Sequence, residues 1–348
     1  MASFTARNNG TLAALITGVA GQDGSYLAEF LLNKNYEVYG MARYCSEKKH
    51  ERIEHIKTNS HFHLIEGDLT DTSRIMSIVS SLSKYSVVEI YNLGAQSHVQ
   101  VSFGQPEYTA NVDAVGTLRI LEAIHQQTNT TVFKFYQAGT SEMFGKIQEP
   151  IQNENTSLYP RSPYGCAKVY SYWITKNYRE SYGMFACTGI LFNHESERRG
   201  PEFVTRKITL GLAEFMKNKT PISLGNIDAR RDWGHAQDYV EAMWLMLQRD
   251  VPDDYVIGTG KTHTVRDFIN EACNVINLPI TWSGEGVDEV AKTLNGDVVI
   301  KIDPQFYRPS EVDVLIADAR KAYVELSWLP KIDFKNLVSR MVNKDVTC

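Results

Sequence analysis

The sequence lacks the features that mark secreted, zinc-stabilised or membrane-spanning proteins. Its five cysteines are scattered and odd in number, with no close-spaced pairs, which argues against a disulfide framework or a zinc site. No segment has the apolar core of a signal peptide or the length of a membrane span. We therefore expect a cytoplasmic protein with reduced thiols.

The sequence also lacks a long basic run. With a formal net charge of -5, we expect neither nucleic acid nor a membrane surface as the main partner. His61 and His63 are spaced like metal ligands on one side of a strand, but no third ligand is indicated nearby, so we predict no metal site. The chain is 43% hydrophobic and 22% charged, which is typical of a globular protein with a sizeable core.

The first half of the chain alternates strand-like and helix-like segments. Apolar runs predict strands at residues 11–17, 36–42, 62–65, 87–92 and 132–137. Helical spacing is found between them, at residues 25–32 and 115–126. This alternation predicts an α/β fold, with a Rossmann-type doubly wound parallel sheet covered by helices on both faces.

At 348 residues the chain is long for one domain, and its pattern becomes less regular after about residue 190. Residues 235–248 predict a helix, and residues 255–260 a strand that rejoins the first sheet. We predict a cofactor-binding Rossmann domain of residues 11–190 plus about 234–262. Residues from about 191–233 plus 263–348 would form a smaller, discontinuous substrate-binding domain.

A glycine-rich turn follows the first predicted strand and opens the first predicted helix. It reads Gly18-Val-Ala-Gly21-Gln22-Asp23-Gly24. Glycines at such a turn let the backbone approach a pyrophosphate, and the free amides of the helix N-terminus then face the anion. An ordinary strand–helix turn is the alternative, but the position at the first junction favours a dinucleotide site.

Arg43, at the end of the second predicted strand, bears on the choice of dinucleotide. An NAD site would have a carboxylate there to accept from the ribose hydroxyl. An arginine can instead pair with a 2′-phosphate, so NADP is favoured. Taken alone, an ordinary surface arginine is an alternative of equal weight. Asp68, after the third strand, could accept from the adenine amino group. The segment Asn92-Leu-Gly-Ala-Gln-Ser97, after the fourth, could lie along the cofactor.

Ser162 and Pro163 predict the start of a helix that carries Tyr164 and Lys168, four residues apart, on one face. A phenol with its usual pKa near 10 is a poor base at neutral pH. A neighbouring ammonium favours the phenolate and makes Tyr164 a usable proton acceptor. An exposed i, i+4 pair is the alternative. The position after a fifth strand, in a chain with the glycine turn, favours catalysis.

Thr140 and Glu142 follow the strand at 132–137. At an extended strand end, residues i and i+2 point the same way, so we expect both side chains to face Tyr164. A hydroxyl there can bind the oxygen being oxidised, and a carboxylate can remove a proton from the carbon beside a ketone. Simple redox chemistry needs no second base, so this pair predicts elimination. The alternative is that Thr140 caps the next turn and Glu142 is solvated.

Eight segments spread over the chain carry a family resemblance. They are GVAGQDGSYLAEFLL (18–32), GDLTD (67–71), IYNLGAQSHV (90–99), YPRSPYGCAK (159–168), LFNHESERRG (191–200), FVTRKI (203–208), SLGNIDARRDWGHAQDYVEAMWLMLQ (223–248) and YRPSEVD (307–313). Together they resemble the GDP-mannose 4,6-dehydratase family of the extended short-chain dehydrogenase/reductase superfamily, over nearly the whole chain.

The resemblance implies a carbon–oxygen lyase that converts GDP-D-mannose to GDP-4-dehydro-6-deoxy-D-mannose and water. The steps are C4 oxidation, C5/C6 elimination and return of the hydride to C6, with NADP recycled. This reaction is the first step toward GDP-6-deoxyhexoses such as GDP-L-fucose or GDP-D-rhamnose. Tyr164 would take the 4-hydroxyl proton and Glu142 the C5 proton. Thr140 would hydrogen-bond the 4-oxygen, and Lys168 would also hold the nicotinamide ribose.

The resemblance implies further binding residues and an oligomer. Cofactor contacts are implied for Gly18, Gly21, Gln22, Asp23, Gly24, Arg43, Asp68, Leu69, Leu93, Ala95, Ser97, Tyr108, Tyr164, Lys168, His194 and Arg199. GDP-sugar contacts are implied for Ser97, Thr140, Glu142, Asn193, Arg231, Arg308 and Glu311. A homodimer or homotetramer is expected, with residues 47–52 either an intersubunit loop or a solvated surface run.

Three residues depart from the family pattern. Tyr44 replaces a usual second basic residue, Gly139 a usual serine and Cys166 a usual alanine; the first could weaken 2′-phosphate affinity and the second could loosen the loop. Two rival functions stay open. An epimerase or 4-keto reductase of the same superfamily would generally lack the acid at Glu142, and a non-catalytic NADP-binding module would leave the site residues unexplained. A secondary NADPH-dependent 4-keto reduction is a further hypothesis.

Overall fold

The computed structural model describes residues 12–44, 50–128, 131–307 and 315–346. The chain divides into two compact units, which are described separately below. Unit 1 spans Met1–Gly145, Pro160–Leu191 and Val240–Tyr255, and unit 2 spans Lys146–Tyr159, Phe192–Tyr239 and Val256–Cys348. Within the described ranges, none of the helices combines the length and the apolar character needed to cross a lipid bilayer.

Unit 1 is built on a sheet whose seven described strands lie in the order β11-β6-β5-β4-β1-β2-β3. The pairs from β6 to β3 are all parallel, and β1 lies between β4 and β2. The strands are β1 (Leu12–Thr17), β2 (Glu37–Ala42), β3 (Phe62–Glu66), β4 (Val87–Asn92), β5 (Val132–Ala138), β6 (Phe185–Leu191) and β11 (Tyr255–Ile257). The predicted doubly wound parallel sheet is confirmed.

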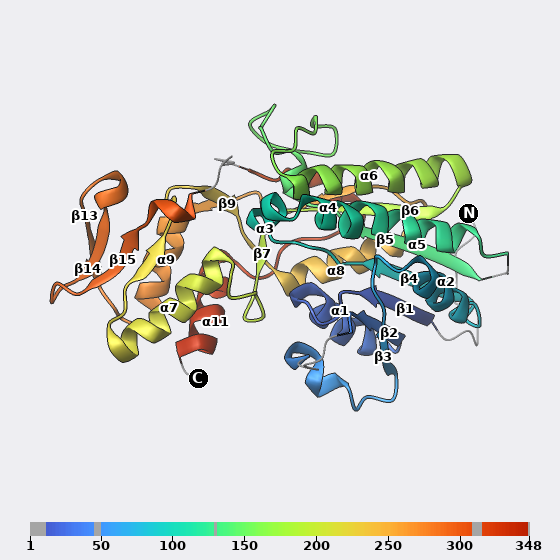
Figure 1. The fold of residues 1–348 in the computed structure, drawn as a ribbon, viewed down its shortest axis with the longest axis horizontal. Helices are drawn as coiled ribbons and strands as arrows, with labels where there is room; N and C mark the ends of the chain where they lie inside the picture. Colours follow the sequence, from blue (N-terminus) through green and yellow to red (C-terminus); the bar gives the residue numbers. More distant parts are fainter. Residues whose placement is uncertain (1–11, 45–49, 129–130, 308–314, 347–348) are drawn as a thin grey trace. The chain divides into compact units, whose positions relative to one another are not determined.

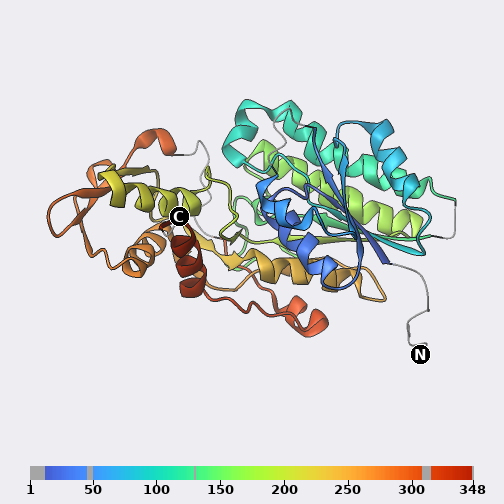
Figure 2. The same ribbon diagram turned by 90° about the horizontal axis from the view of Figure 1, so that it is seen from below.

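Helices cover both faces of this sheet (Figures 1 and 2). The face covered by α2, α5 and α6 shares one core with the strands, and on the other face Phe30 of α1 meets Trp244 of α8 with ring centroids 5.8 Å apart. The helices are α1 (Gln22–Leu32), η1 (Glu51–Ile56), α2 (Thr72–Ser81), α3 (Val99–Gly104), α4 (Pro106–Thr109), the π-helix η2 (Ala110–Val115), α5 (Gly116–His125), η3 (Ser141–Met143), α6 (Pro163–Tyr182) and α8 (Ala236–Leu247).

The central strands are buried on both faces, which explains why β1 and β4 read as continuous apolar runs. Glu89 of β4 is the exception in that run. Its carboxylate accepts from the Tyr36 hydroxyl (3.1 Å), the Tyr91 hydroxyl (2.7 Å) and Gln248 Nε2 (2.9 Å). Three donors offset the cost of burying this charged group.

Unit 2 has its own core, in which α7, α9 and α11 pack with a mixed sheet of strand order β13-β14-β15-β8. Its remaining strands are short and pair in twos, β10 with β7 and β12 with β9. The elements are β7 (His194–Glu195), α7 (Val204–Asn218), β8 (Ile222–Leu224), β9 (Arg230–Asp232), β10 (Gly234–His235), β12 (Thr262–Thr264), α9 (Val265–Val275), β13 (Ile280–Ser283), η4 (Gly286–Asp288), β14 (Val290–Thr293), β15 (Val298–Ile302), η5 (Pro304–Phe306), α10 (Arg320–Leu326) and α11 (Phe334–Val346).

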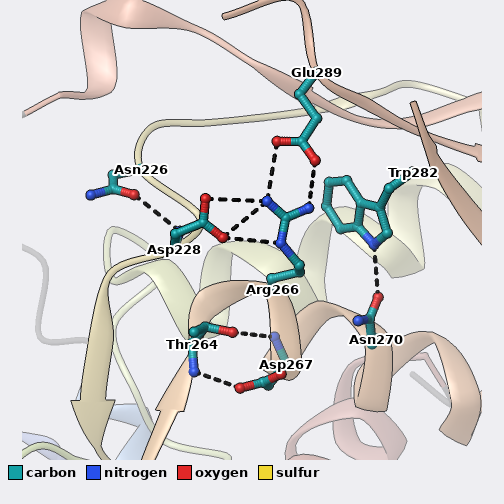
Figure 3. Close-up of polar contacts among 8 residues, drawn as sticks. All are labelled: Asn226, Asp228, Thr264, Arg266, Asp267, Asn270, Trp282 and Glu289. Atoms are coloured by element: carbon teal, nitrogen blue, oxygen red, sulfur yellow. Dashed lines mark hydrogen bonds and ion pairs between the residues drawn. The ribbon is translucent and has the colours of Figure 1, made fainter. Parts of the chain in front are cut away.

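The stretch after residue 190 is more regular than its sequence suggested. Helix α7 occupies fifteen residues within it, and Ile208, Leu212 and Phe215 of this helix are fully buried. Their spacing of four and three residues is the helical signal that the charged neighbours obscured. Helix α9 begins with a reciprocal capping box between Thr264 and Asp267 (Figure 3).

Candidate active site

The glycine turn after β1 is crowded on its inner side and open at its tip. A Cβ at Gly18, which has φ +69°, would lie 2.9 Å from the Cα of Gly94 in the loop after β4. A Cβ at Gly24 would lie 2.4 Å from the Gly18 carbonyl oxygen. A Cβ at Gly21, the exposed N-cap of α1, would meet only that carbonyl among the described residues, at 3.1 Å. The bare backbone at the tip and the start of α1 fit a bound pyrophosphate.

Gln22 and Asp23 form the first turn of α1. Gln22 Nε2 donates to Asp23 Oδ1 at 3.0 Å, which ties the two side chains to each other. An acidic side chain in the first turn also complements the positive end of the helix dipole.

Arg43 and Tyr108 come from distant parts of unit 1 and meet beside the sheet. Arg43 Nη1 donates to the Tyr108 hydroxyl at 2.5 Å. The neighbouring Tyr44 is 72% exposed. Two residues that the family pattern assigns to the cofactor are thus brought together by the fold, and the Arg43 guanidinium remains at an exposed position.

Asp68 and Leu69, after β3, have different surroundings. Asp68 Oδ1 accepts from the Thr70 amide and hydroxyl, both at 2.8 Å, so this carboxylate closes its own turn. Leu69 is buried, and its side chain lies where a Cβ at Gly94 or Gly116 would be placed. Leu69 therefore contributes packing beneath the loop after β4.

The loop after β4 carries Leu93, Ala95 and Ser97, of which Ser97 is exposed and the other two are half-buried. Hydrogen bonds fix the main chain of this loop. The Gly94 amide donates to Thr17 Oγ1 at 2.9 Å, and the Gln96 amide donates to Asp113 Oδ1 at 2.7 Å. The loop is thereby tied to β1 and to the π-helix η2.

Helix α6 starts as the sequence predicted. Ser162 Oγ accepts from the Gly165 amide at 3.0 Å, and Pro163 occupies the first turn. Tyr164 is buried, and Lys168 is only 2% exposed. Lys168 Nζ donates to the carbonyl of Ala138 at 2.9 Å and lies 5.8 Å from the centre of the Tyr164 ring. Lys168 thus joins α6 to the end of β5.

The extended geometry expected for Thr140 and Glu142 is wrong. Strand β5 ends at Ala138, and Thr140 caps the 3₁₀ helix η3, with its Oγ1 accepting from the Glu142 amide at 3.2 Å. The spacing rule for strands does not apply because Glu142 lies inside a 3₁₀ turn. The capping role that was kept as the alternative for Thr140 is therefore present, while Glu142 is half-buried.

The turn nevertheless packs against the start of α6. A Cβ at Gly165 would lie 2.9 Å from the Glu142 carbonyl oxygen, so the main chains of the turn and of α6 are in direct contact. Gly139 ties the turn to β6, because its amide donates to the Gly189 carbonyl at 2.8 Å. A Cβ at Gly139 would also lie 2.8 Å from the Thr188 methyl carbon. At this glycine the turn is held tightly.

Asp113 is a buried group that the sequence reasoning did not single out. It lies in η2 and is 2% exposed. Burial raises the pKa of Asp113 to about 6, against the effect of the Lys168 charge. Burial lowers the pKa of Lys168, and the carboxylates of Asp113 and Asp23 oppose that shift. An acidic residue among the apolar neighbours Val112, Ala114 and Val115 was the available signal.

Two predicted cofactor residues, His194 and Arg199, belong to unit 2. His194 Nδ1 lies 2.8 Å from the Phe192 carbonyl oxygen, and its ring stacks on Tyr239 at 4.5 Å. Arg199 Nε pairs with Glu195 Oε2 at 3.0 Å. Both side chains are therefore held in defined orientations within their own unit.

The predicted GDP-sugar residues of unit 2 are only partly described. The Asn193 carbonyl accepts from the Gly234 amide at 3.0 Å. Arg231 on β9 is buried, and its Nη1 donates to the Arg230 carbonyl at 2.8 Å. Arg308 and Glu311 lie outside the described residues. Residues 47–49 of the predicted intersubunit loop do so as well.

His61, just before β3, and His63 of β3 both pair with one carboxylate. Glu37 Oε1 lies 2.7 Å from His61 Nδ1, and Glu37 Oε2 lies 2.8 Å from His63 Nε2. In the described parts of the chain, no group of three or more His, Cys, Asp or Glu side chains is placed to hold a metal ion.

Solved structures of low sequence identity share this fold. The dTDP-glucose 4,6-dehydratase DesIV from Streptomyces venezuelae, solved with NAD, matches with a TM-score of 0.79 at 20% identity, over 95% of this chain and 96% of its own. RMD from Pseudomonas aeruginosa, solved with NADPH, matches with a TM-score of 0.73 at 18% identity, over 97% of this chain and 100% of its own. The described sheet and these matches together define the class as Rossmann-type α/β proteins.

Sequence comparison narrows this class to one family. The family model for GDP-mannose 4,6 dehydratase matches residues 15–341. The GDP-mannose 4,6 dehydratase of Drosophila melanogaster is 55% identical over 341 residues, which cover 96% of this chain and 86% of that protein. The chain belongs to the GDP-mannose 4,6-dehydratase family.

Proposed function

We propose that the protein converts GDP-D-mannose into GDP-4-dehydro-6-deoxy-D-mannose and water, with NADP as a recycled cofactor. The observation that carries this proposal is the arrangement at the start of α6. Lys168 of α6 donates a hydrogen bond to the Ala138 carbonyl at the end of β5. The Thr140–Glu142 turn packs against the start of α6 at Gly165. A proton acceptor with an ammonium beside it and a second carboxylate suit oxidation followed by elimination.

Tyr164 is the group proposed to accept the proton of the sugar 4-hydroxyl. The buried Lys168 ammonium, whose Nζ lies 5.8 Å from the ring centre, stabilises the phenolate electrostatically. Its hydrogen bond to the Ala138 carbonyl fixes the direction of that charge. Burial strengthens the interaction because few water molecules screen it.

Thr140 is proposed to donate to the sugar 4-oxygen, and Glu142 to remove the C5 proton. The Thr140 oxygen already accepts from the Glu142 amide, so its hydroxyl hydrogen is the part suited to a substrate oxygen. The same hydrogen bond fixes the main chain of Glu142 relative to Thr140. A 4-ketone acidifies the neighbouring C–H, so a carboxylate is then an adequate base, and loss of the 6-hydroxyl as water completes the elimination.

The residues of unit 1 fit a nicotinamide dinucleotide, which supplies hydride acceptance from C4 and hydride donation to C6 when bound. The bare turn at Gly21 and the start of α1 would hold the pyrophosphate, and the loop at Leu93–Ser97 would lie along it. NADP is preferred over NAD because Arg43, and not a carboxylate, follows β2. An Arg43→Ala variant should lose about tenfold or more in NADP affinity and little in NAD affinity, measured by titration.

We further propose that the two predicted domains bind different ligands. Residues 11–190 plus about 234–262 would bind the cofactor, and the remainder would bind the GDP-sugar through Asn193, Arg231, Arg308 and Glu311. His194 and Arg199 would add cofactor contacts. A homodimer or homotetramer is part of the same proposal, and light scattering after size-exclusion chromatography would determine the mass of the particle.

The decisive experiment is to incubate the purified protein with GDP-mannose in deuterated water and determine the product mass. Loss of one water with a solvent deuteron retained at C5 is the expected outcome. Unchanged substrate would first call for added NADP, in view of Tyr44. Substrate that stayed unchanged after that addition would refute the assignment and favour the epimerase or reductase alternatives.

A further inference from the structure

Asp113 is a buried carboxylate of unit 1 to which the proposed reaction assigns no role. Its Oδ1 accepts from the Gln96 amide at 2.7 Å, and its carbonyl oxygen accepts from Ser171 Oγ at 2.7 Å. Within the described residues, Asp113 Oδ2 has no hydrogen-bond partner. Burying a carboxylate oxygen without a hydrogen-bond donor costs folding free energy. We therefore expect a nearby positive charge that offsets this cost.

The local backbone brings Asp113 to the face of α6 that carries Lys168. Asp113 lies in the π-helix η2, a wider turn than an α-helix and one that is frequent at functional sites. Ser171, which bonds the Asp113 carbonyl, is three residues beyond Lys168 and so lies on the same side of α6. The η2 backbone is therefore docked beside Lys168.

Charged and titratable groups from several elements surround Lys168. Asp113 of η2 and Asp23 of α1 both act on the Lys168 ammonium by charge, and Asp113 has the larger effect. Tyr164 of α6 lies within cation–π range. From β5, the only contact is the neutral Ala138 carbonyl among the described interactions. Asp113 is thus the main counter-charge of Lys168.

We propose that Asp113 is a positioning residue that keeps Lys168 in its ammonium form and locks the loop after β4 to α6. The two effects use different atoms of one residue. The carboxylate acts on Lys168 and on the Gln96 amide, and the carbonyl acts on Ser171. Its catalytic consequence rests on the proposed function, because it acts through the roles of Lys168 and Tyr164.

The first test is the pH dependence of Asp113→Asn. The amide oxygen can still accept from the Gln96 amide, so the variant removes the charge and little else. Loss of that charge should let Lys168 lose its proton at lower pH. The alkaline fall of kcat, and of NADP affinity measured without substrate, should both move down by about one pH unit, with the KM for GDP-mannose changed less than twofold.

A matched control is Glu89→Gln. Glu89 is also a buried carboxylate of unit 1, it sits on β4, and burial likewise raises its pKa. The control should lower the melting temperature and leave both pH profiles unchanged. If Asp113→Asn also lowered the melting temperature alone, with wild-type pH profiles, Asp113 would be a structural residue only and the proposal would be overturned.

The second test is a double-mutant cycle in thermal stability, which needs neither substrate nor cofactor. Asp113→Asn leaves a buried ammonium without its main counter-charge, so it should lower the melting temperature more in the wild-type background than in a Lys168→Met background. If Asp113→Asn alone failed to fold, recovery of a cooperative transition in the double variant would support the proposal. Equal losses in both backgrounds, or no recovery, would refute it. Because the cycle is independent of turnover, an inactive protein would count against the proposed function and not against this coupling.

Discussion

Two buried aspartates, Asp232 of unit 2 and Asp113 of unit 1, have opposite surroundings. In unit 2, Asp232 is 0% exposed and both of its oxygens are used. Oδ1 accepts from the Thr259 amide and hydroxyl, and Oδ2 accepts from the Gly260 amide at 2.8 Å and the Ala317 amide at 3.4 Å. In unit 1, Asp113 is 2% exposed, and among the described residues only one of its oxygens has a hydrogen-bond donor. A buried carboxylate whose two oxygens both accept hydrogen bonds is typical of a structural role. A buried carboxylate beside Lys168 that has a donor for only one oxygen indicates a functional role.

Two cationic side chains, Arg266 of unit 2 and Lys168 of unit 1, show the same difference. Arg266 of unit 2 is engaged on both sides (Figure 3). Its Nη1 lies 2.5 Å from Glu289, its Nη2 lies 2.9 Å from Asp228, and its guanidinium stacks 4.6 Å from the centre of the Trp282 ring. Lys168 of unit 1 has one neutral carbonyl acceptor among its described hydrogen bonds. The energy of the Arg266 network stabilises unit 2, whereas the charge of Lys168 remains available to Tyr164.

The largest expected effect comes from unit 1. Tyr164→Phe and Glu142→Gln should each lower kcat by about 10²–10⁴, because each removes one proton-transfer group. The folds should persist, as both substitutions nearly conserve shape. Glu142→Gln should still oxidise the sugar, so reduced nicotinamide would accumulate and be seen by its absorbance. Retention of more than about a tenth of wild-type kcat by either variant would contradict the proposed roles.

The next largest effect is on the stability of unit 2. Asp232→Asn places an amide nitrogen against one pair of donors, so it should lower the free energy of unfolding by about 3 kcal/mol in denaturant titrations. Asp228→Asn is the control, since Asp228 is 67% exposed and should change stability by about 0.5 kcal/mol or less. Equal effects of the two substitutions would show that saturation at Asp232 is not stabilising.

The sequence predicted those parts of the fold that depend on local rules, such as helix capping and the alternation of apolar segments. Ser162 and Pro163 marked the start of α6 because capping and fixed φ are local properties, and the structure confirms it. The parallel sheet followed from alternating apolar runs. The predicted domain boundaries and the roles of the site residues stay predictions.

What could not be predicted depends on packing between distant segments. The 3₁₀ turn at Glu142 forms where the main chain meets Gly165, and no residue near Glu142 signals that contact. The π-helix at Asp113 likewise forms where η2 meets Ser171 of α6, fifty-eight residues later. The local sequence around Asp113 does not distinguish the π-helix η2 from the α-helix α5 that follows it. Tertiary contacts decide such local details more than propensity does.

A smaller effect is expected from the Arg266 network. Arg266→Ala should lower the free energy of unfolding by about 1 kcal/mol, since its ion pairs are partly screened by solvent. Double-mutant cycles should give a larger coupling with Glu289→Ala than with Asp228→Ala, because Glu289 is 15% exposed and Asp228 is far more so. Equal coupling free energies would mean that burial does not determine which of the two ion pairs is stronger.

The smallest effect concerns Glu37 of unit 1, whose two carboxylate oxygens each have a histidine partner. The hydrogen bonds from His61 and His63 lower the pKa of Glu37. A depressed pKa stabilises the fold above the unfolded value of about 4.3, and that stabilisation is lost as the pH falls through the folded value. Glu37→Gln should therefore cost about 0.5 kcal/mol at pH 6 and almost nothing near pH 3, measured by urea titration at each pH. Glu54→Gln, at a side chain that is 67% exposed, is the control and should show a smaller difference at both pH values. A cost for Glu37→Gln that grew as the pH fell would show that this carboxylate, unlike Asp232, is not held by its donors.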